Sequence, residues 1–254
     1  MVTTDDLSLG PVPSLPSKVL ITGTGRSGTT LLVQVLTDLG LDTGVTAETP
    51  IDQRAGAGLE LPVDDPSGPR IVKSPTIIPR LDGLLQHGTI RLEHVIVPIR
   101  DLDVATASRV RLTRYGTDLR TWGGLMGTRR ADRQREALAL LEYELFLTLA
   151  RHDVPHTLLA FPRFAHDWEY TYRKLAFLDP SVPPDRWRAA IAARVQPAMT
   201  HEQTLSRSEQ VMTIGGTAYN RFVARPARAL KTLVRPNGGA GAMVNDERQE
   251  GSTT

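Results

Sequence analysis

The stretch ITGTGRSGTTLL, residues 21–32, places glycines, hydroxyls and a guanidinium between an apolar run and the start of a helical pattern. Three glycines allow a tight turn whose amides point inward, and the N–H groups of a helix N-terminus form a natural anion site. Arg26 adds a planar guanidinium that can grip phosphate or sulfate oxygens. We call residues 23–30 the anion loop. Its predicted ligand-binding residues are Gly25, Arg26, Ser27, Gly28, Thr29 and Thr30.

The anion loop departs from the nucleotide-binding pattern G-x-x-x-x-G-K-[ST] at one position. Gly23, Gly28 and Thr30 fit the pattern, but Thr29 stands where the lysine belongs. That lysine normally reaches the β- and γ-phosphates of the nucleotide, and the next hydroxyl holds magnesium. The departure disfavours ordinary ATP or GTP chemistry and leaves an atypical P-loop kinase as an alternative.

A second strand-then-helix motif, HVIVPIRDLDVATASRV, covers residues 94–110. Arg100 ends its apolar run, and Ser108 follows eight residues later in the predicted helix. Two helical turns bring the serine back toward the strand end, so that its hydroxyl and the guanidinium of Arg100 can converge on one phosphate.

The loop sequence GTGRSGTTLL resembles the 5′-phosphosulfate loop of sulfotransferases that use 3′-phosphoadenosine 5′-phosphosulfate (PAPS), above all that of bacterial members with arginine in the loop. Arg100 and Ser108 match the arginine and serine with which this family binds the 3′-phosphate. The resemblance is closest over residues 18–111 and looser to about residue 180. It implies PAPS as sulfuryl donor, 3′,5′-adenosine bisphosphate as product and no metal.

Sulfuryl transfer needs positioned charges and a general base for the attacking hydroxyl. Lys73, at the end of the apolar run RIVKS, is one of four lysines in the chain and is expected to stabilise the leaving group or the sulfonate oxygens. The histidine base of animal cytosolic sulfotransferases has no counterpart, because Pro75 occupies its position. The resemblance to carbohydrate-type sulfotransferases instead implies a glutamate base, and we expect Glu48, with Glu60 as its rival.

The predicted fold is α/β, with a parallel sheet of about four to five strands between two helical layers. Short continuous apolar runs at 18–23, 70–74, 94–100 and 156–162 predict buried strands, and periodic segments such as 29–39 and 132–151 predict covering helices. In such sheets ligands bind beyond the carboxyl ends of the strands, where both motifs lie.

The 254 residues predict an irregular segment at 1–17, one domain at 18–233 and a disordered tail at 234–254. Family members often add a late basic segment to the 3′-phosphate site, which implies a role for Arg221. A formal charge of +2 and the lack of a long apolar segment predict a cytoplasmic protein without nucleic-acid partners or a membrane span. The arginine-rich, lysine-poor composition indicates a bacterial source.

The acceptor is expected to be a hydroxyl of a carbohydrate, lipid or small metabolite, and the oligomeric state is left open. A non-catalytic nucleotide-binding relative is the remaining alternative to an enzyme. Donor binding without turnover of any acceptor would favour that alternative.

Overall fold

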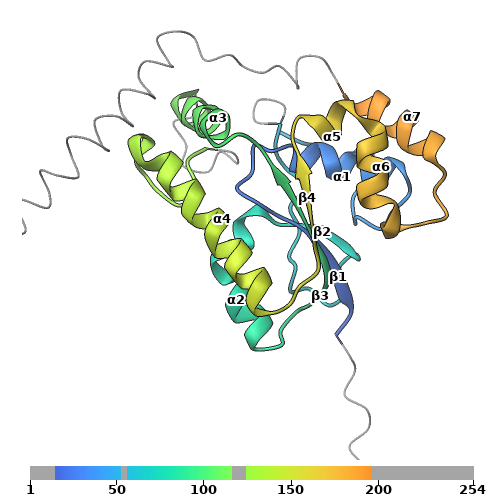
Figure 1. Cartoon of the computed structure of the whole chain (residues 1–254), viewed down its shortest axis with the longest axis horizontal. Coiled ribbons are helices and arrows are strands. Elements are labelled where there is room, and N and C mark those ends of the chain that lie inside the picture. The colour runs from blue at the N-terminus through green and yellow to red at the C-terminus, as the bar shows by residue number, and fades with distance from the viewer. Residues whose placement is uncertain (1–14, 53–55, 116–123, 196–254) are drawn as a thin grey trace, which may run out of the picture. The chain divides into compact units, whose positions relative to one another are not determined.

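Four parallel strands form the centre of the fold, in the order β2-β1-β3-β4 (Figure 1). The computed structural model describes residues 15–52, 56–115 and 124–195. Its strands are β1 (Ser17–Ile21), β2 (Ile71–Lys73), β3 (Arg91–Ile99) and β4 (His156–Ala160). Its helices are α1 (Thr29–Asp38), α2 (Ile78–Gln86), α3 (Leu102–Tyr115), α4 (Gln134–Arg151), α5 (Arg163–His166), α6 (Trp168–Leu175) and α7 (Pro184–Arg194). Short 3₁₀ turns cover Pro75–Ile77, Ala131–Arg133 and Ala176–Leu178.

Strand β1 is apolar throughout because both faces of the sheet are covered. Successive side chains of a strand point to opposite faces. Val19 and Ile21 accordingly pack into the core on one face, and Leu20 packs into the core on the other. All three side chains are fully buried, as a continuous apolar run in a parallel sheet requires.

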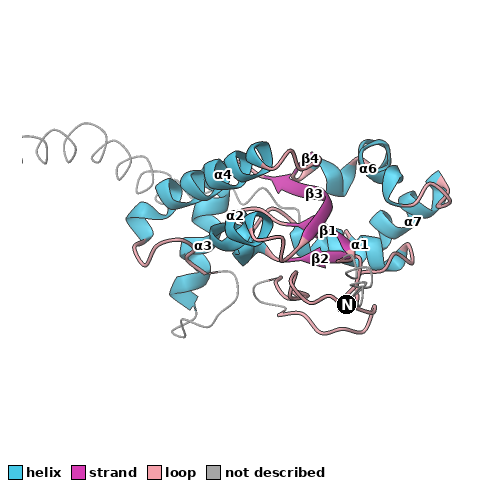
Figure 2. Ribbon diagram, turned by 90° about the horizontal axis from the view of Figure 1, so that it is seen from below, coloured by secondary structure: helices cyan, strands magenta, loops and turns pink. Residues whose placement is uncertain are grey.

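The helices form a layer on each face of the sheet (Figures 1 and 2). On one face, α1, α5, α6 and α7 share a core with β1, β2, β3 and β4. On the other face, α2 and α4 pack over the opposite sides of β1, β2 and β3, and α3 packs beside α4. This arrangement is a three-layer α/β/α fold and confirms the predicted fold class.

The strand order creates a switch point between β1 and β3. The chain moves from β1 outward to β2 through α1, and then returns past β1 to β3 through α2. Because parallel crossovers are right-handed, connections that run in opposite directions lie on opposite faces, as α1 and α2 do. The segments after β1 and after β3 therefore flank the crevice where such sheets bind ligands.

All four predicted strands are present, with small shifts at their ends. Strand β3 ends at Ile99, so Arg100 is the first residue after the strand rather than its last residue. The predicted helix at 132–151 begins with a 3₁₀ turn, and α4 starts at Gln134. The predicted N-terminal segment overlaps β1 at Ser17, and its residues 1–14, like the predicted boundary at 233, lie outside the described residues.

Within the described ranges, no helix combines the length and the apolar character needed to cross a bilayer. The longest of these helices is α4, with 18 residues, and it carries several charged side chains.

The packing of α4 can be tested by truncating one leucine on its buried face and one on its exposed face. Leu145 is fully buried, whereas Leu140 in the same helix is 57% exposed. We expect Leu145→Ala to lower the free energy of unfolding by about 2–5 kcal/mol, because it leaves a cavity. The matched variant Leu140→Ala should change it by less than about 0.5 kcal/mol. Urea unfolding in dilute solution measures both values, and equal losses would contradict the described packing.

Candidate functional site

The anion loop connects β1 to α1 through a run of left-handed backbone conformations. Gly25 and Gly28 adopt φ angles of 66° and 82°, and Arg26 adopts 59°. A left-handed conformation costs a residue other than glycine about 1–3 kcal/mol and is concentrated at functional sites. Gly28 is the N-cap of α1, and among the described residues no side chain caps this helix. The first amides of α1 are therefore directed at the loop.

Close packing leaves no room for side chains at two of these glycines. A Cβ atom at Gly25 would collide with the guanidinium of Arg109. A Cβ atom at Gly28 would lie 2.7 Å from Cδ2 of Phe161, which follows β4. Glycine is therefore required at both positions by sterics as well as by the backbone conformation.

Arg109 in α3 supports the anion loop through hydrogen bonds to backbone carbonyls, a role that the sequence analysis did not identify. Its side chain is buried, and its Nε donates to the carbonyl of Thr24 at 3.0 Å. A second donor reaches the carbonyl of Gly124 at 2.6 Å. Burial, together with the charge of Arg26, lowers the pKa of Arg109 to about 10. Its bond to Thr24 spans 85 positions of the chain, so no local pattern in the sequence marks this role.

Glu142 in α4 was also not predicted and supports the same residue of the loop. The hydroxyl of Thr24 donates to Glu142 Oε1 at 3.1 Å. Burial raises the pKa of the Glu142 carboxyl, and the bond from Thr24 opposes this shift. Thr24 is thus held through its carbonyl by α3 and through its hydroxyl by α4.

The two motifs found in the sequence meet at the switch point. Arg26 Nε donates to Ser108 Oγ at 3.0 Å, although the residues are 82 positions apart. Arg100 Nη1 donates to the carbonyl of Arg26 at 3.1 Å. The Arg100 guanidinium carbon lies 5.0 Å from the ring centroid of Phe161, which is close enough for a cation–π contact. The loop, the strand end and the helical serine therefore form one cluster.

This cluster concentrates positive charge. Burial, followed by the charges of Arg100 and Arg111, lowers the pKa of Arg26 to about 10, and Asp52 acts in the opposite direction. Burial also lowers the pKa of Arg100. Guanidinium groups that are desolvated and held near one another are stabilised by an anion placed among them.

Ser27 adds an unused polar atom to the loop. Its side chain is fully buried, and its Oγ has no hydrogen-bond partner among the described residues. Buried hydroxyls in proteins are almost always bonded, so an orphaned one needs an explanation. A ligand oxygen in the loop would supply the missing partner.

Lys73, the last residue of β2, ties the anion loop to a neighbouring segment. Its ammonium donates to Thr30 Oγ1 at 2.8 Å, to the carbonyl of Gly58 at 2.5 Å and to Glu60 Oε1 at 2.8 Å. These bonds use all three of its protons. Burial lowers the pKa of Lys73, and the bond that Lys73 donates to Glu60 opposes this shift. The side chain is therefore an internal crosslink beside the loop and not a solvated strand-end lysine.

The two predicted glutamates lie in different places. Glu60 is joined to Thr30 of the anion loop through the ammonium of Lys73. Glu48 is exposed, and its pKa is lowered mainly by a hydrogen bond from Thr46, with a smaller contribution from Arg194. Arg194 pairs with Asp38 in the last turn of α1, at 2.5 Å.

Because α1 is about 15 Å long, its last turn lies well away from the anion loop at its first turn. The structure thus joins Glu60 to the loop through Lys73, whereas Glu48 is exposed and is influenced by the charge of Arg194, which pairs with Asp38 at the far end of α1. Arg221, the remaining predicted residue, lies outside the described residues.

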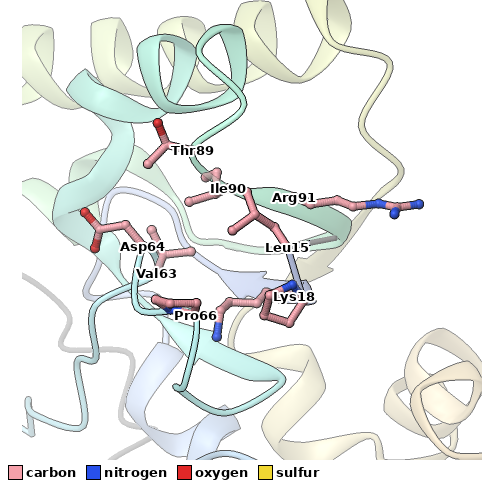
Figure 3. Close-up of a pocket in the computed structure, with 9 residues that line it drawn as sticks. Leu15, Lys18, Val63, Asp64, Pro66, Thr89, Ile90 and Arg91 are labelled. Carbon is pink, nitrogen blue, oxygen red and sulfur yellow. The ribbon is translucent and has the colours of Figure 1, made fainter. Parts of the chain in front are cut away.

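A small pocket lies at the opposite edge of the sheet (Figure 3). It has a cavity volume of about 10 Å³ and includes Lys18 and Arg91 at the amino ends of β1 and β3. Lys18 donates to the carbonyls of Gly68 and Pro69, at 2.9 and 3.0 Å. A cavity of this size has room for about one water molecule, so it is not a substrate site.

The support of Thr24 by Glu142 predicts a pH-dependent effect of Glu142→Gln. The carboxyl pKa is raised in the folded protein, so stabilisation by this group is full below its unfolded value of 4.5 and is lost as the pH rises through the raised pKa. Glutamine keeps an acceptor for Thr24 without the charge. We therefore expect the variant to be more stable than wild type at about pH 8 and equally stable at about pH 4.

Urea unfolding at both pH values measures this difference in the free energy of unfolding. Glu144→Gln, at an exposed position of the same helix, is the control and should show no pH-dependent difference. If Glu142→Gln raises the free energy of unfolding by the same amount at both pH values, the pKa of the Glu142 carboxyl is not raised in the folded protein.

A scan against protein-family models finds no model that matches this chain, and a search of curated proteins finds no match. The functional interpretation consequently depends on the geometry of the loop and its neighbours.

Proposed function

We propose that this chain is a sulfotransferase that transfers a sulfuryl group from PAPS to a hydroxyl of a carbohydrate, lipid or other small metabolite. The observation that carries the proposal is the meeting of Arg26, Ser108 and Arg100 at the switch point. A donor with phosphates at both the 5′ and 3′ positions needs two anion-binding groups side by side. The amides of the anion loop and the pair Arg100–Ser108 fit that requirement.

In this proposal the anion loop receives the 5′-phosphosulfate. The orphaned Oγ of Ser27 and the first amides of α1 would donate to its oxygens, with Gly25, Gly28 and Thr29 shaping the cradle. Arg100 and Ser108 would hold the 3′-phosphate, and the contact with Phe161 restrains the plane of the Arg100 guanidinium.

Lys73 is proposed to act through Thr30. Because the ammonium donates to Thr30 Oγ1, the hydroxyl proton of Thr30 is left to point toward the ligand. Lys73 is then a positioning residue and adds a nearby positive charge as the leaving phosphate gains charge.

The reaction is an in-line displacement at sulfur. A bond forms between the acceptor oxygen and sulfur, the bond from sulfur to the 5′-phosphate oxygen breaks, and that oxygen keeps the electron pair. Glu60 is the carboxylate that we propose as the base for the acceptor proton, because Lys73 places it beside the loop. Its second carboxylate oxygen would receive the proton.

The alternative of a P-loop kinase is disfavoured by the contact between Lys73 and Thr30. In nucleotide-binding loops the hydroxyl at the position of Thr30 coordinates magnesium. Here an ammonium donates to that oxygen from 2.8 Å, and a divalent cation at the same oxygen would be repelled by it. A metal-independent donor is therefore the better fit, and a cytoplasmic enzyme without nucleic-acid partners is part of the same proposal.

Calorimetric binding of 3′,5′-adenosine bisphosphate tests the donor site. We expect the wild type to bind it more tightly than ATP with magnesium. Arg100→Ala should weaken the binding roughly tenfold to hundredfold, because it removes a charge-assisted bond, and Ser108→Ala roughly threefold to tenfold. Adenosine 5′-phosphate, which lacks the 3′-phosphate, should bind Ser108→Ala and wild type with similar affinity.

Arg80→Ala is a matched control, since Arg80 on α2 forms an exposed pair with Asp64 and its loss should not affect affinity. Melting temperatures show whether each variant is folded. The sulfotransferase proposal would be refuted in favour of a kinase if ATP with magnesium bound more tightly than 3′,5′-adenosine bisphosphate and its affinity were unchanged by Arg100→Ala and Ser108→Ala.

The role of the two glutamates is tested by turnover of PAPS in the presence of pooled carbohydrates, lipids and phenols. Release of 3′,5′-adenosine bisphosphate is the readout. We expect Glu60→Gln to reduce turnover by about 100-fold or more while the bisphosphate still binds, because the base acts only in the transition state. Glu48→Gln should have wild-type turnover. The opposite pattern would restore Glu48 as the base, and binding by the wild type without any turnover would indicate a non-catalytic relative.

A further inference from the structure

The outward face of α4 carries apolar side chains that the core does not use. Leu141, Leu145 and Leu149 pack into the core beneath the helix. On the other side of the helix, Tyr143 is 65% exposed, and Leu140 is also largely exposed. A surface helix ordinarily has polar residues on its outward face, so this apolar face indicates a contact.

These outward residues form a line along the helix. Glu136, Leu140, Tyr143, Leu147 and Arg151 follow one another at steps of four, three, four and four residues, which keeps them on one face. Leu147 is half-buried, and the other four are exposed. The line is apolar in its middle, with a negative charge at one end and a positive charge at the other. We call it the α4 stripe.

We propose that the α4 stripe packs antiparallel against the α4 stripe of a second copy of this chain. The twofold axis passes between Tyr143 and Glu144, near the middle of the helix. Symmetry then determines every other contact. The register places Leu140 against the partner's Leu147, Glu136 against the partner's Arg151 and Tyr143 against the partner's Glu144.

Charge complementarity is the reason for choosing a second copy in this orientation. Each antiparallel pair of helices contains the Glu136–Arg151 contact twice, and the phenol of Tyr143 can donate to the carboxylate of the partner's Glu144. A parallel pair would place Glu136 against itself and Arg151 against itself. Arg151 also lies 3.5 Å from Asp82 of its own chain, and a guanidinium has enough donors for both carboxylates.

The size of the contact determines how stable the dimer should be. The 18 residues of α4 span about 27 Å, and one helix per subunit gives an interface at the small end of the known range. The dimer is therefore expected to form and dissociate with protein concentration. This inference is independent of the proposed sulfotransferase activity.

Sedimentation velocity of the full chain over a range of concentrations measures the dimer. We expect Glu136→Arg and Arg151→Glu each to weaken dimerisation about fivefold to tenfold, because each change affects two symmetric contacts. The double variant Glu136→Arg/Arg151→Glu should recover wild-type affinity. Arg188→Glu, an exposed change on α7, is the control and should not alter the dimer.

The absence of cysteine from the chain allows a direct test of the register. Leu140→Cys/Leu147→Cys should give a covalent dimer on mild oxidation, seen on a non-reducing gel. Within one helix these positions are about 10 Å apart, which is too far for an internal disulfide. Leu140→Cys alone should give little covalent dimer, because the twofold axis separates the two copies of this position along the helix.

Three outcomes would overturn the proposal. They are a chain that stays monomeric at every concentration, a dimer that the charge reversals leave unchanged, and single-cysteine variants that crosslink as well as the double variant. The last outcome would point to a parallel or unspecific contact.

Discussion

The shape of the anion loop depends on the buried guanidinium of Arg109. Its bond to the carbonyl of Thr24 holds the chain where β1 ends and the left-handed run begins. The same guanidinium occupies the space that a side chain at Gly25 would need, and it lies next to Ser108, which contacts Arg26. Arg109 thus positions the backbone of the anion loop and leaves no space for a side chain at Gly25. It also lies beside Ser108, where the second motif contacts the loop.

The cost of this arrangement is a concentration of like charge. Arg26 and Arg109 are both desolvated. The charges of Arg100 and Arg111 help to lower the pKa of Arg26, and the charge of Arg26 helps to lower the pKa of Arg109. A core designed for stability alone would not gather these charges at one sheet edge. Lys73 is different, because Glu60 neutralises it inside the protein.

Much of the fold could be predicted because its signals are local. Each strand is a short apolar run, and in a covered parallel sheet such runs are continuous, as Val19, Leu20 and Ile21 illustrate. The end of β3 was less predictable: Arg100 continues the extended chain in the sequence pattern, but the ladder stops at Ile99. The helical stretch after residue 131 begins as a 3₁₀ turn, a detail of hydrogen bonding that periodicity does not contain.

The layered fold and the residue types at the switch point can be inferred from the sequence, because the spacing of Arg100 and Ser108 and the glycines of the loop are local properties. Which distant groups join them depends on long-range packing. The segment between Gly58 and Lys73, which are 15 positions apart, and the connection that carries Glu48 contain no periodic signal that would fix their course. Long-range packing placed Glu60 beside Lys73 and Glu48 toward the end of α1, and it brought Arg109 and Glu142 beneath Thr24. Such contacts join residues far apart in the chain, so no local pattern records them.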